Sequence, residues 1–148
     1  MKKIIIVLAL LVIAVCTYSI PQNFIKSNEV LEVRYYTLGN PTNVGTYMFD
    51  NVYMINDKNL KNIDSKNLVN VIGTDYIMKG DYDKFRDIIS TYHIDVKKSE
   101  VVENIHIIYG VYEGACQPKY VDGYAVNIQI AIHDNVITVG TPLIMGSY

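Results

Sequence analysis

Apolar residues recur at every second position near the C-terminus of the chain. Val126–Ile132 has an aliphatic residue at each alternate site, with polar or small residues between them. A period of two predicts a strand with one buried face. Asp134–Asn135 follows, and both residue types tolerate the positive φ that a type I′ turn requires. The predicted hairpin has two aliphatic pairs on one face: Ile132 with Ile137, and Ile130 with Val139.

Four other segments have the composition of strands. β-Branched and aromatic residues, which favour extended backbone, are concentrated in them. They are Val30–Tyr36, Tyr47–Ile55 with a bulge or bend at Asp50–Asn51, Leu68–Met78 with a break at Gly73–Asp75, and Ile105–Tyr112. In the last of these the odd-numbered residues are predicted to form the aliphatic face. His93–Val96 is predicted as a short extended piece before the charged residues 97–100.

One amphipathic helix is predicted over Asp81–Tyr92. Asp81 can cap its first turn by accepting from free backbone N–H groups. The apolar residues that follow recur at helical spacing and form one face: Tyr82, Phe85, Ile88, Ile89 and Tyr92. Loops are predicted at Gly39–Gly45 and Glu113–Gly123, and a loop or one weak helical turn at Asp57–Asn67. The order of strands, helix and strands predicts an α+β domain, an antiparallel sheet with one main helix packed on one face.

The N-terminus has the pattern of an export signal. Lys2 and Lys3 precede the unbroken apolar run Ile4–Cys16. This pattern fits a cleaved signal peptide. It also fits an uncleaved membrane helix, because Ile4–Ile20 would be about 26 Å long at ~1.5 Å per residue. A third alternative is a lipoprotein modified at Cys16. All three place the remainder outside the cytoplasm, as a secreted protein or as the outer domain of a single-pass membrane protein.

The 148 residues therefore divide into three parts. Residues 1–20 are the signal or anchor, 21–28 a linker, and 29–148 a single extracytoplasmic α+β domain. The formal charge is −2, and it becomes −4 without the segment that carries Lys2 and Lys3. An acidic domain does not attract phosphate backbones, so nucleic acid is not an expected partner. The thirteen tyrosines are expected at half-buried sheet positions rather than in a ligand platform.

The C-terminal hairpin also resembles a known family. Asn127–Ala131 reads N-I-Q-I-A, Thr138–Ile144 reads T-V-G-T-P-L-I, and the chain ends on Tyr148. These stretches are similar to the closing strands of the YwmB family, uncharacterised exported proteins of spore-forming Gram-positive bacteria. The resemblance implies an α+β fold like that of the TATA-box-binding protein, with a shortened N-terminal part, and it implies no activity. Independently of the resemblance, the predicted hairpin register places Gly140 opposite Gln129. Thr141–Pro142 is predicted to end the ladder, because proline has no N–H to donate.

Three histidines are candidates for chemistry. His93 follows the predicted helix and can interact with its C-terminal dipole. His106 and His133 lie on predicted strands, on the faces opposite the main aliphatic rows. If these strands are neighbours, the two imidazoles could form an acid–base pair or bind a metal. The simpler interpretation is that both are solvent-facing sheet residues.

Other reactive residues lack supporting spacing. Asp81, Asp83 and Asp87 lack the glycine and distal glutamate of a calcium loop, so a helix cap and a solvated face are expected. Cys116 lies in a predicted loop with no local base, and Cys16 lies in the hydrophobic run, so a disulfide between them is not expected. The sequence predicts no metal and no cofactor.

Two functional hypotheses follow from these observations. The first is a non-enzymatic interaction domain of the cell envelope, membrane-associated or secreted. Its protein partner would contact the polar sheet face or the loops Gly39–Gly45 and Glu113–Gly123. The alternative is a small envelope hydrolase that uses His106 and His133. The alternative needs the two histidines to share one site.

Overall fold

The structure, a computed structural model, describes residues 29–40, 43–57, 68–115 and 118–146. Residues 1–28, with the predicted signal or anchor and the linker, lie outside this range, as do most of the predicted loop Asp57–Asn67, Cys116 and Tyr148. No helix in the described ranges is long and apolar enough to cross a membrane.

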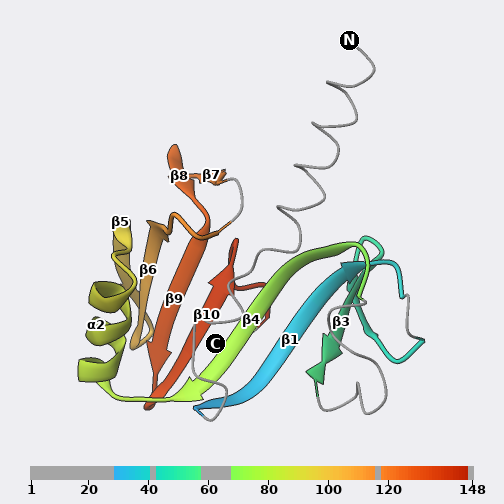
Figure 1. The fold of residues 1–148 in the computed structure, drawn as a ribbon, viewed down its shortest axis with the longest axis horizontal. Coiled ribbons are helices and arrows are strands. Elements are labelled where there is room, and N and C mark those ends of the chain that lie inside the picture. Colours follow the sequence, from blue (N-terminus) through green and yellow to red (C-terminus); the bar gives the residue numbers. More distant parts are fainter. Residues whose placement is uncertain (1–28, 41–42, 58–67, 116–117, 147–148) are drawn as a thin grey trace.

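An eight-stranded antiparallel sheet forms the body of the domain (Figure 1). Its strand order is β2-β3-β1-β4-β10-β9-β6-β5, so β2 and β5 are the edges. The strands are β1 Val30–Leu38, β2 Thr46–Phe49, β3 Val52–Asn56, β4 Val71–Lys79, β5 Asp95–Val102, β6 Ile105–Val111, β9 Ile128–His133 and β10 Val136–Thr141. A small ribbon, β7 Lys119–Val121 with β8 Tyr124–Val126, stands apart from it. The predicted α+β class with an antiparallel sheet and one main helix is confirmed for the described residues.

Two-residue turns with positive φ connect four pairs of strands. Every turn contains at least one Asn, Asp or Gly, the residue types that tolerate the left-handed region at low cost. They are Asp50–Asn51, Glu103–Asn104, Asp122–Gly123 and Asp134–Asn135. The last of these closes the predicted C-terminal hairpin, whose register is confirmed: Ile132 pairs with Ile137 and Ile130 with Val139.

Four predicted segments differ from the structure. Asp50–Asn51 is a turn that separates β2 from β3, and not a bulge within one strand. Gly73–Asp75 does not break a strand, because β4 runs through it. The charged residues 97–100 belong to β5, which begins at Asp95 and pairs with β6. The predicted loop Glu113–Gly123 contains β7.

Helix α2, Tyr82–Thr91, lies on one face of the sheet, which we call the helix face (Figure 1). Its buried residues, Phe85 and Ile88, pack on alternate residues of the central strands. Those partners are Met78 of β4, Ile108 of β6, Ile128, Ile130 and Ile132 of β9, and Ile137 and Val139 of β10. The buried row of the C-terminal hairpin is therefore the floor on which the helix packs. A second, smaller cluster contains Ile55 and Leu68, with Tyr35 and Val71 packed against it.

The N-terminus of α2 is capped as predicted. The Asp81 carboxylate accepts a hydrogen bond from the Lys84 backbone N–H at 3.0 Å. Asp81→Ala removes this acceptor and is expected to lower the free energy of unfolding by about 1 kcal/mol. Urea denaturation measures the difference. Asp87→Ala, at an exposed site in the same helix, is the matched control, and an equal loss in both variants would contradict the capping role.

Candidate functional site

A buried carboxylate lies at the centre of the opposite face of the sheet. Asp75 is in the middle of β4 and is fully buried. Its Oδ2 accepts a hydrogen bond from the Tyr36 hydroxyl at 2.7 Å and from the Gly146 N–H at 3.2 Å. Its Oδ1 has no hydrogen-bond partner in the structure. Asp75 therefore holds together β4, β1 and the chain that follows β10.

Burial and hydrogen bonding shift the pKa of Asp75 in opposite directions. Burial raises the pKa of Asp75, while the hydrogen bonds from Tyr36 and Gly146 and the nearby Arg34 guanidinium lower it in part, and the net pKa lies above the ordinary value. Burial and the neighbouring Asp75 carboxylate raise the pKa of Tyr36. The tyrosine thus keeps its proton and remains a hydrogen-bond donor at neutral pH.

The C-terminal tail, Pro142–Gly146, folds back over the same face, which we call the tail face. The Ile144 N–H donates to Gln129 Oε1 at 3.0 Å, and Gly146 reaches Asp75. Gly140 lies beneath the tail, where a Cβ atom would collide with the backbone of Leu143 and Ile144. Gly140 pairs with Gln129 on β9, as predicted, and β10 ends at Thr141.

Asn127 has a different structural role at the start of β9. Its side chain accepts from the Tyr112 N–H at 2.8 Å and donates to the Tyr112 carbonyl at 2.9 Å. These two bonds fix the end of β6 to the junction of β8 and β9. Asn127, Gln129 and Ala131 are all buried, so this face is not the open polar surface that the alternation predicts. The tail covers part of the sheet face that the alternation of apolar and polar residues assigned to solvent.

His106 lies on the helix face, opposite to its predicted position. It pairs with Ile132 on β9, and its ring lies 5.2 Å from the ring of Phe85, centroid to centroid, at an angle of 46°. Its Nε2 lies 2.7 Å from Ser99 Oγ, and its Nδ1 lies 2.9 Å from the Tyr82 hydroxyl. The prediction was wrong because β6 buries residues on both faces, Ile107 on one and Ile108 on the other.

Serine next to histidine is the geometry of a nucleophile with its base. A third group normally orients the imidazole through its other nitrogen, and in hydrolases that group is a carboxylate. Here the group at Nδ1 is the Tyr82 hydroxyl, and Tyr82 and Ser99 are exposed at the sheet edge. The three side chains connect β5, β6 and α2 by hydrogen bonds, which is a sufficient structural role.

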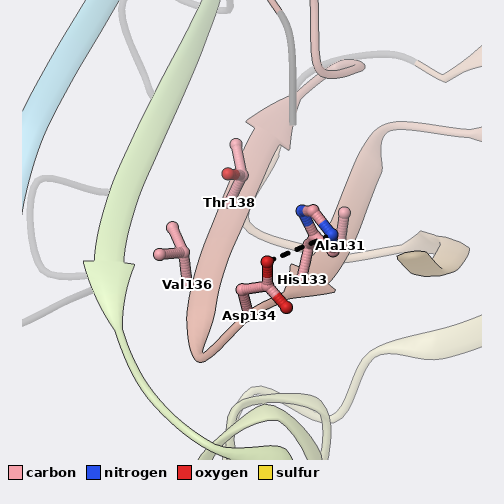
Figure 2. Close-up of a pocket in the computed structure, with 5 residues that line it drawn as sticks. All are labelled: Ala131, His133, Asp134, Val136 and Thr138. Atoms are coloured by element: carbon pink, nitrogen blue, oxygen red, sulfur yellow. Dashed lines mark ion pairs between the residues drawn. The ribbon is translucent and has the colours of Figure 1, made fainter. Parts of the chain in front are cut away.

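His133 lies on the tail face at the end of β9. Its Nε2 is 3.5 Å from a carboxylate oxygen of Asp134, the first turn residue. Together with Ala131, Val136 and Thr138 these residues line a small pocket of about 150 Å³ (Figure 2). Figure 2 shows the Asp134 carboxylate turned toward the His133 ring, with the aliphatic side chain of Val136 on the β10 side. A space of this size admits a few water molecules and not a drug-sized ligand.

The two histidines of the hydrolase hypothesis therefore do not share a site. His106 pairs with Ile132, so both project from the helix face, and His133 as the next residue projects from the other. The sheet lies between the two imidazoles. In the described ranges, no group of three or more His, Cys, Asp or Glu side chains is arranged to hold a metal ion.

The three helix aspartates have local roles. Asp81 is the cap, and Asp83 forms an ion pair with Arg86 at 2.6 Å. Asp83 and Asp87 also line a groove of about 600 Å³ beside α2, whose floor includes the buried side chains of Met78 and Ile88. His93 is exposed just beyond the helix with a positive φ of 49°.

A charged network connects β5 to the β7–β8 ribbon. Lys98 Nζ lies 2.7 Å from Asp122 and 3.0 Å from Glu100. The Tyr109 hydroxyl donates to Glu100 at 2.7 Å, and Lys98 lies over the Tyr109 ring. Hydrogen bonds from Tyr109 and then Lys98 lower the pKa of Glu100, and those to Asp122 and Glu100 raise the pKa of Lys98. Lys98 and Glu100 are therefore both charged at neutral pH.

Neither Asp75 nor Tyr36 stands out as a site residue in the sequence. A charged residue between the apolar residues 71–72 and 76–78 was interpreted as a strand break. The better signal is that an aspartate inside an otherwise apolar strand needs a buried partner.

No protein-family model, curated protein or solved structure matches the chain.

Proposed function

We propose that the chain is a non-enzymatic interaction domain that acts outside the cytoplasm, membrane-associated or secreted, and is similar to the YwmB proteins. The N-terminal pattern of Lys2 and Lys3 before a long apolar run supports the location. The N-I-Q-I-A and T-V-G-T-P-L-I stretches support the family. Exposed apolar side chains near the β2 edge support a role in binding another protein.

One row of side chains near the β2 edge carries this proposal. Leu38 of β1 and Phe49 of β2 both pair with Val52 of β3, one on each side. Leu38 is 47% exposed and Phe49 is 48% exposed, while Val52 between them is buried. Exposed apolar side chains close to a sheet edge offer a surface for a protein contact. They flank the loop Gly39–Gly45, which the sequence analysis proposed as a contact.

The polar groups beneath the surface support a binding role rather than catalysis. Asp75, Gln129 and Asn127 all hold backbone in place. His106 and His133 project from opposite faces, which removes the shared site that the hydrolase alternative requires. An exposed apolar row on a domain whose buried polar groups serve the fold fits a surface that docks a partner.

Site-specific photocrosslinking tests the proposal. A photoreactive phenylalanine analogue at Phe49 of the full chain, in its native cells, is expected to give a discrete adduct with an envelope protein. Leu38→Ser is expected to reduce the adduct at least several-fold, because it removes half of the exposed row while Leu38 contributes little to the core. Adducts are measured on denaturing gels.

The same analogue at Ser90, exposed on α2, is the matched control. Identical adducts from both positions, or none from Phe49, would contradict the contact surface. A hydrolysis that His106→Ala abolishes without unfolding the domain would contradict the non-enzymatic role instead. The two parts of the proposal therefore fail separately.

A further inference from the structure

Strand β5 is the edge of the sheet farthest from the Leu38–Phe49 row. It pairs with β6 on one side, and on its other side no described strand pairs with it. Val101 is the most exposed of its apolar residues, at 67%. An edge strand of eight residues presents unpaired backbone groups to which another strand can add.

The hairpin geometry identifies the residues whose backbone groups point outward. Glu103–Asn104 is a two-residue turn, so the flanking pair Val102 and Ile105 exchanges both of its hydrogen bonds. Bonded and non-bonded pairs then alternate from Val102 back to Lys98, and the register shifts between Lys98 and Val96. Ser99 and Val101 fall at non-bonded sites, so their N–H and C=O groups point away from β6.

The next ladder is consistent with this assignment. In the C-terminal hairpin His133 and Val136 flank the two-residue turn and are bonded to each other. The backbone N–H and C=O of Ile132 therefore point toward β6, where its partner is His106. His106 in turn pairs with Val101 on β5 at a non-bonded site. The same alternation thus runs through three strands and ends on the outer side of β5.

We propose that β5 pairs antiparallel with β5 of a second copy of this chain, with Ser99 on the two-fold axis. Each Ser99 N–H would then donate to the C=O of Ser99 of the partner subunit. The same surface serves both copies, as a two-fold dimer requires. This dimer uses the edge opposite to the Leu38–Phe49 row and does not depend on the function proposed for that row.

Charge complementarity selects this register and this occupant. With Ser99 on the axis, Lys98 lies opposite Glu100 of the partner subunit, and Glu100 lies opposite the partner's Lys98. Each chain already pairs Lys98 with Glu100, so in the dimer the two pairs would join into one network of four alternating charges on the tail face. A shift of one residue would place Glu100 opposite the partner's Glu100, which like charges disfavour. A contact of this length gives a dimer that depends on concentration.

Sedimentation of the full chain in detergent micelles, over a range of concentrations, tests the proposal. The wild type is expected to form dimers. Val101→Pro removes an N–H that the fold does not use, so dimers are expected to disappear with the unfolding curve unchanged. Glu100→Lys places like charges opposite each other and is expected to raise the dimer Kd roughly tenfold. Lys98→Glu combined with Glu100→Lys restores opposite charges and is expected to restore the dimer.

A cross-link tests the register. In a chain with Cys16→Ser and Cys116→Ser, Ser99→Cys is expected to form an intermolecular disulfide, since opposed Cα atoms of a bonded pair are about 5.5 Å apart. Lys84→Cys on α2 is the control and is expected to stay reduced. A monomer at all concentrations overturns the proposal. So does a dimer that keeps its Kd in Val101→Pro or in Glu100→Lys, or one that Ser99→Cys does not cross-link.

Discussion

Asp75→Ala is expected to lower the free energy of unfolding by about 2–4 kcal/mol, because it leaves buried donors without an acceptor. The Tyr36 hydroxyl, on a fully buried side chain, and the Gly146 N–H both donate to this carboxylate. The loss should appear in two parts. The sheet becomes less stable, and the tail separates from it.

Two further variants separate these effects. Asp75→Asn keeps an acceptor oxygen of the same size, so its loss should be smaller than that of Asp75→Ala. Tyr36→Phe removes one donor and leaves the bond to Gly146 intact, with an expected loss of about 1 kcal/mol. Urea denaturation gives the stabilities, and amide exchange at Gly146 reports the tail. If the alanine and asparagine variants are equally stable, Asp75 does not act as an acceptor.

The pH dependence of stability follows from the same carboxylate. Burial raises the pKa of Asp75 in the folded state above that of the unfolded chain, despite its hydrogen bonds. The folded state therefore holds the proton more strongly, which adds stability below the unfolded pKa, near about 4. This contribution is lost as the pH rises through the folded-state pKa. In Asp75→Asn it is absent, so the wild type should lose stability relative to that variant as the pH rises from about 4.

The C-terminal hairpin could be predicted because its determinants are local. Alternating aliphatic residues, a turn pair that tolerates positive φ and the length of the turn all agree on one register. The structure has that register, with Ile132 opposite Ile137. The helix was predictable for the same reason, since Asp81 and the apolar spacing lie within twelve residues.

The interrupted strands could not be predicted from local pattern. Residues 97–100 are charged because β5 is an edge whose side chains reach solvent and form ion pairs, and charge of this kind is also typical of loops. Asp75 is accommodated within β4 because Tyr36 and the tail bond to it. Those partners are 39 and 71 residues away along the chain. No short stretch of the sequence contains both the buried carboxylate and the groups that donate hydrogen bonds to it.

The faces of β6 show a related difficulty. Alternation identifies which residues share a face, but not which face is buried when both are covered. Ile107 and Ile108 are both buried, so a rule that assigns the aliphatic row to the core placed His106 on the wrong side. The location of α2 and of the tail decides the matter, and both are tertiary features.

The tail also explains the motif that suggested the family. Gln129 holds Ile144, and Gly140 leaves room for the tail backbone. Asn127 holds the end of β6. Each of these residues has a structural role in closing the sheet, so the motif can persist without an active site. Function is therefore better sought at the sheet edges than in the motif.

Gly140→Ala is expected to displace the tail and to cost about 1–3 kcal/mol, because the added methyl group meets backbone that no rotamer change can move aside. The atoms in its path are the Leu143 carbonyl carbon and the Ile144 N and Cα. Displacement would break the bonds from Ile144 to Gln129 and from Gly146 to Asp75. The strain and the lost hydrogen bonds therefore both contribute to the expected loss of stability.

A chain that ends at Thr141 gives the matching control for Gly140→Ala. Without the tail the alanine meets no backbone, and alanine restricts the unfolded chain more than glycine does, so the substitution should cost nothing or stabilise by a few tenths of a kcal/mol. The double-mutant cycle between Gly140→Ala and the truncation therefore measures the interaction of the tail with the sheet. Additive losses in the two chains would mean that alanine acts on the strand alone. A coupling of at least about 1 kcal/mol would show that the methyl group acts by removing the tail, because only contacting groups couple this strongly.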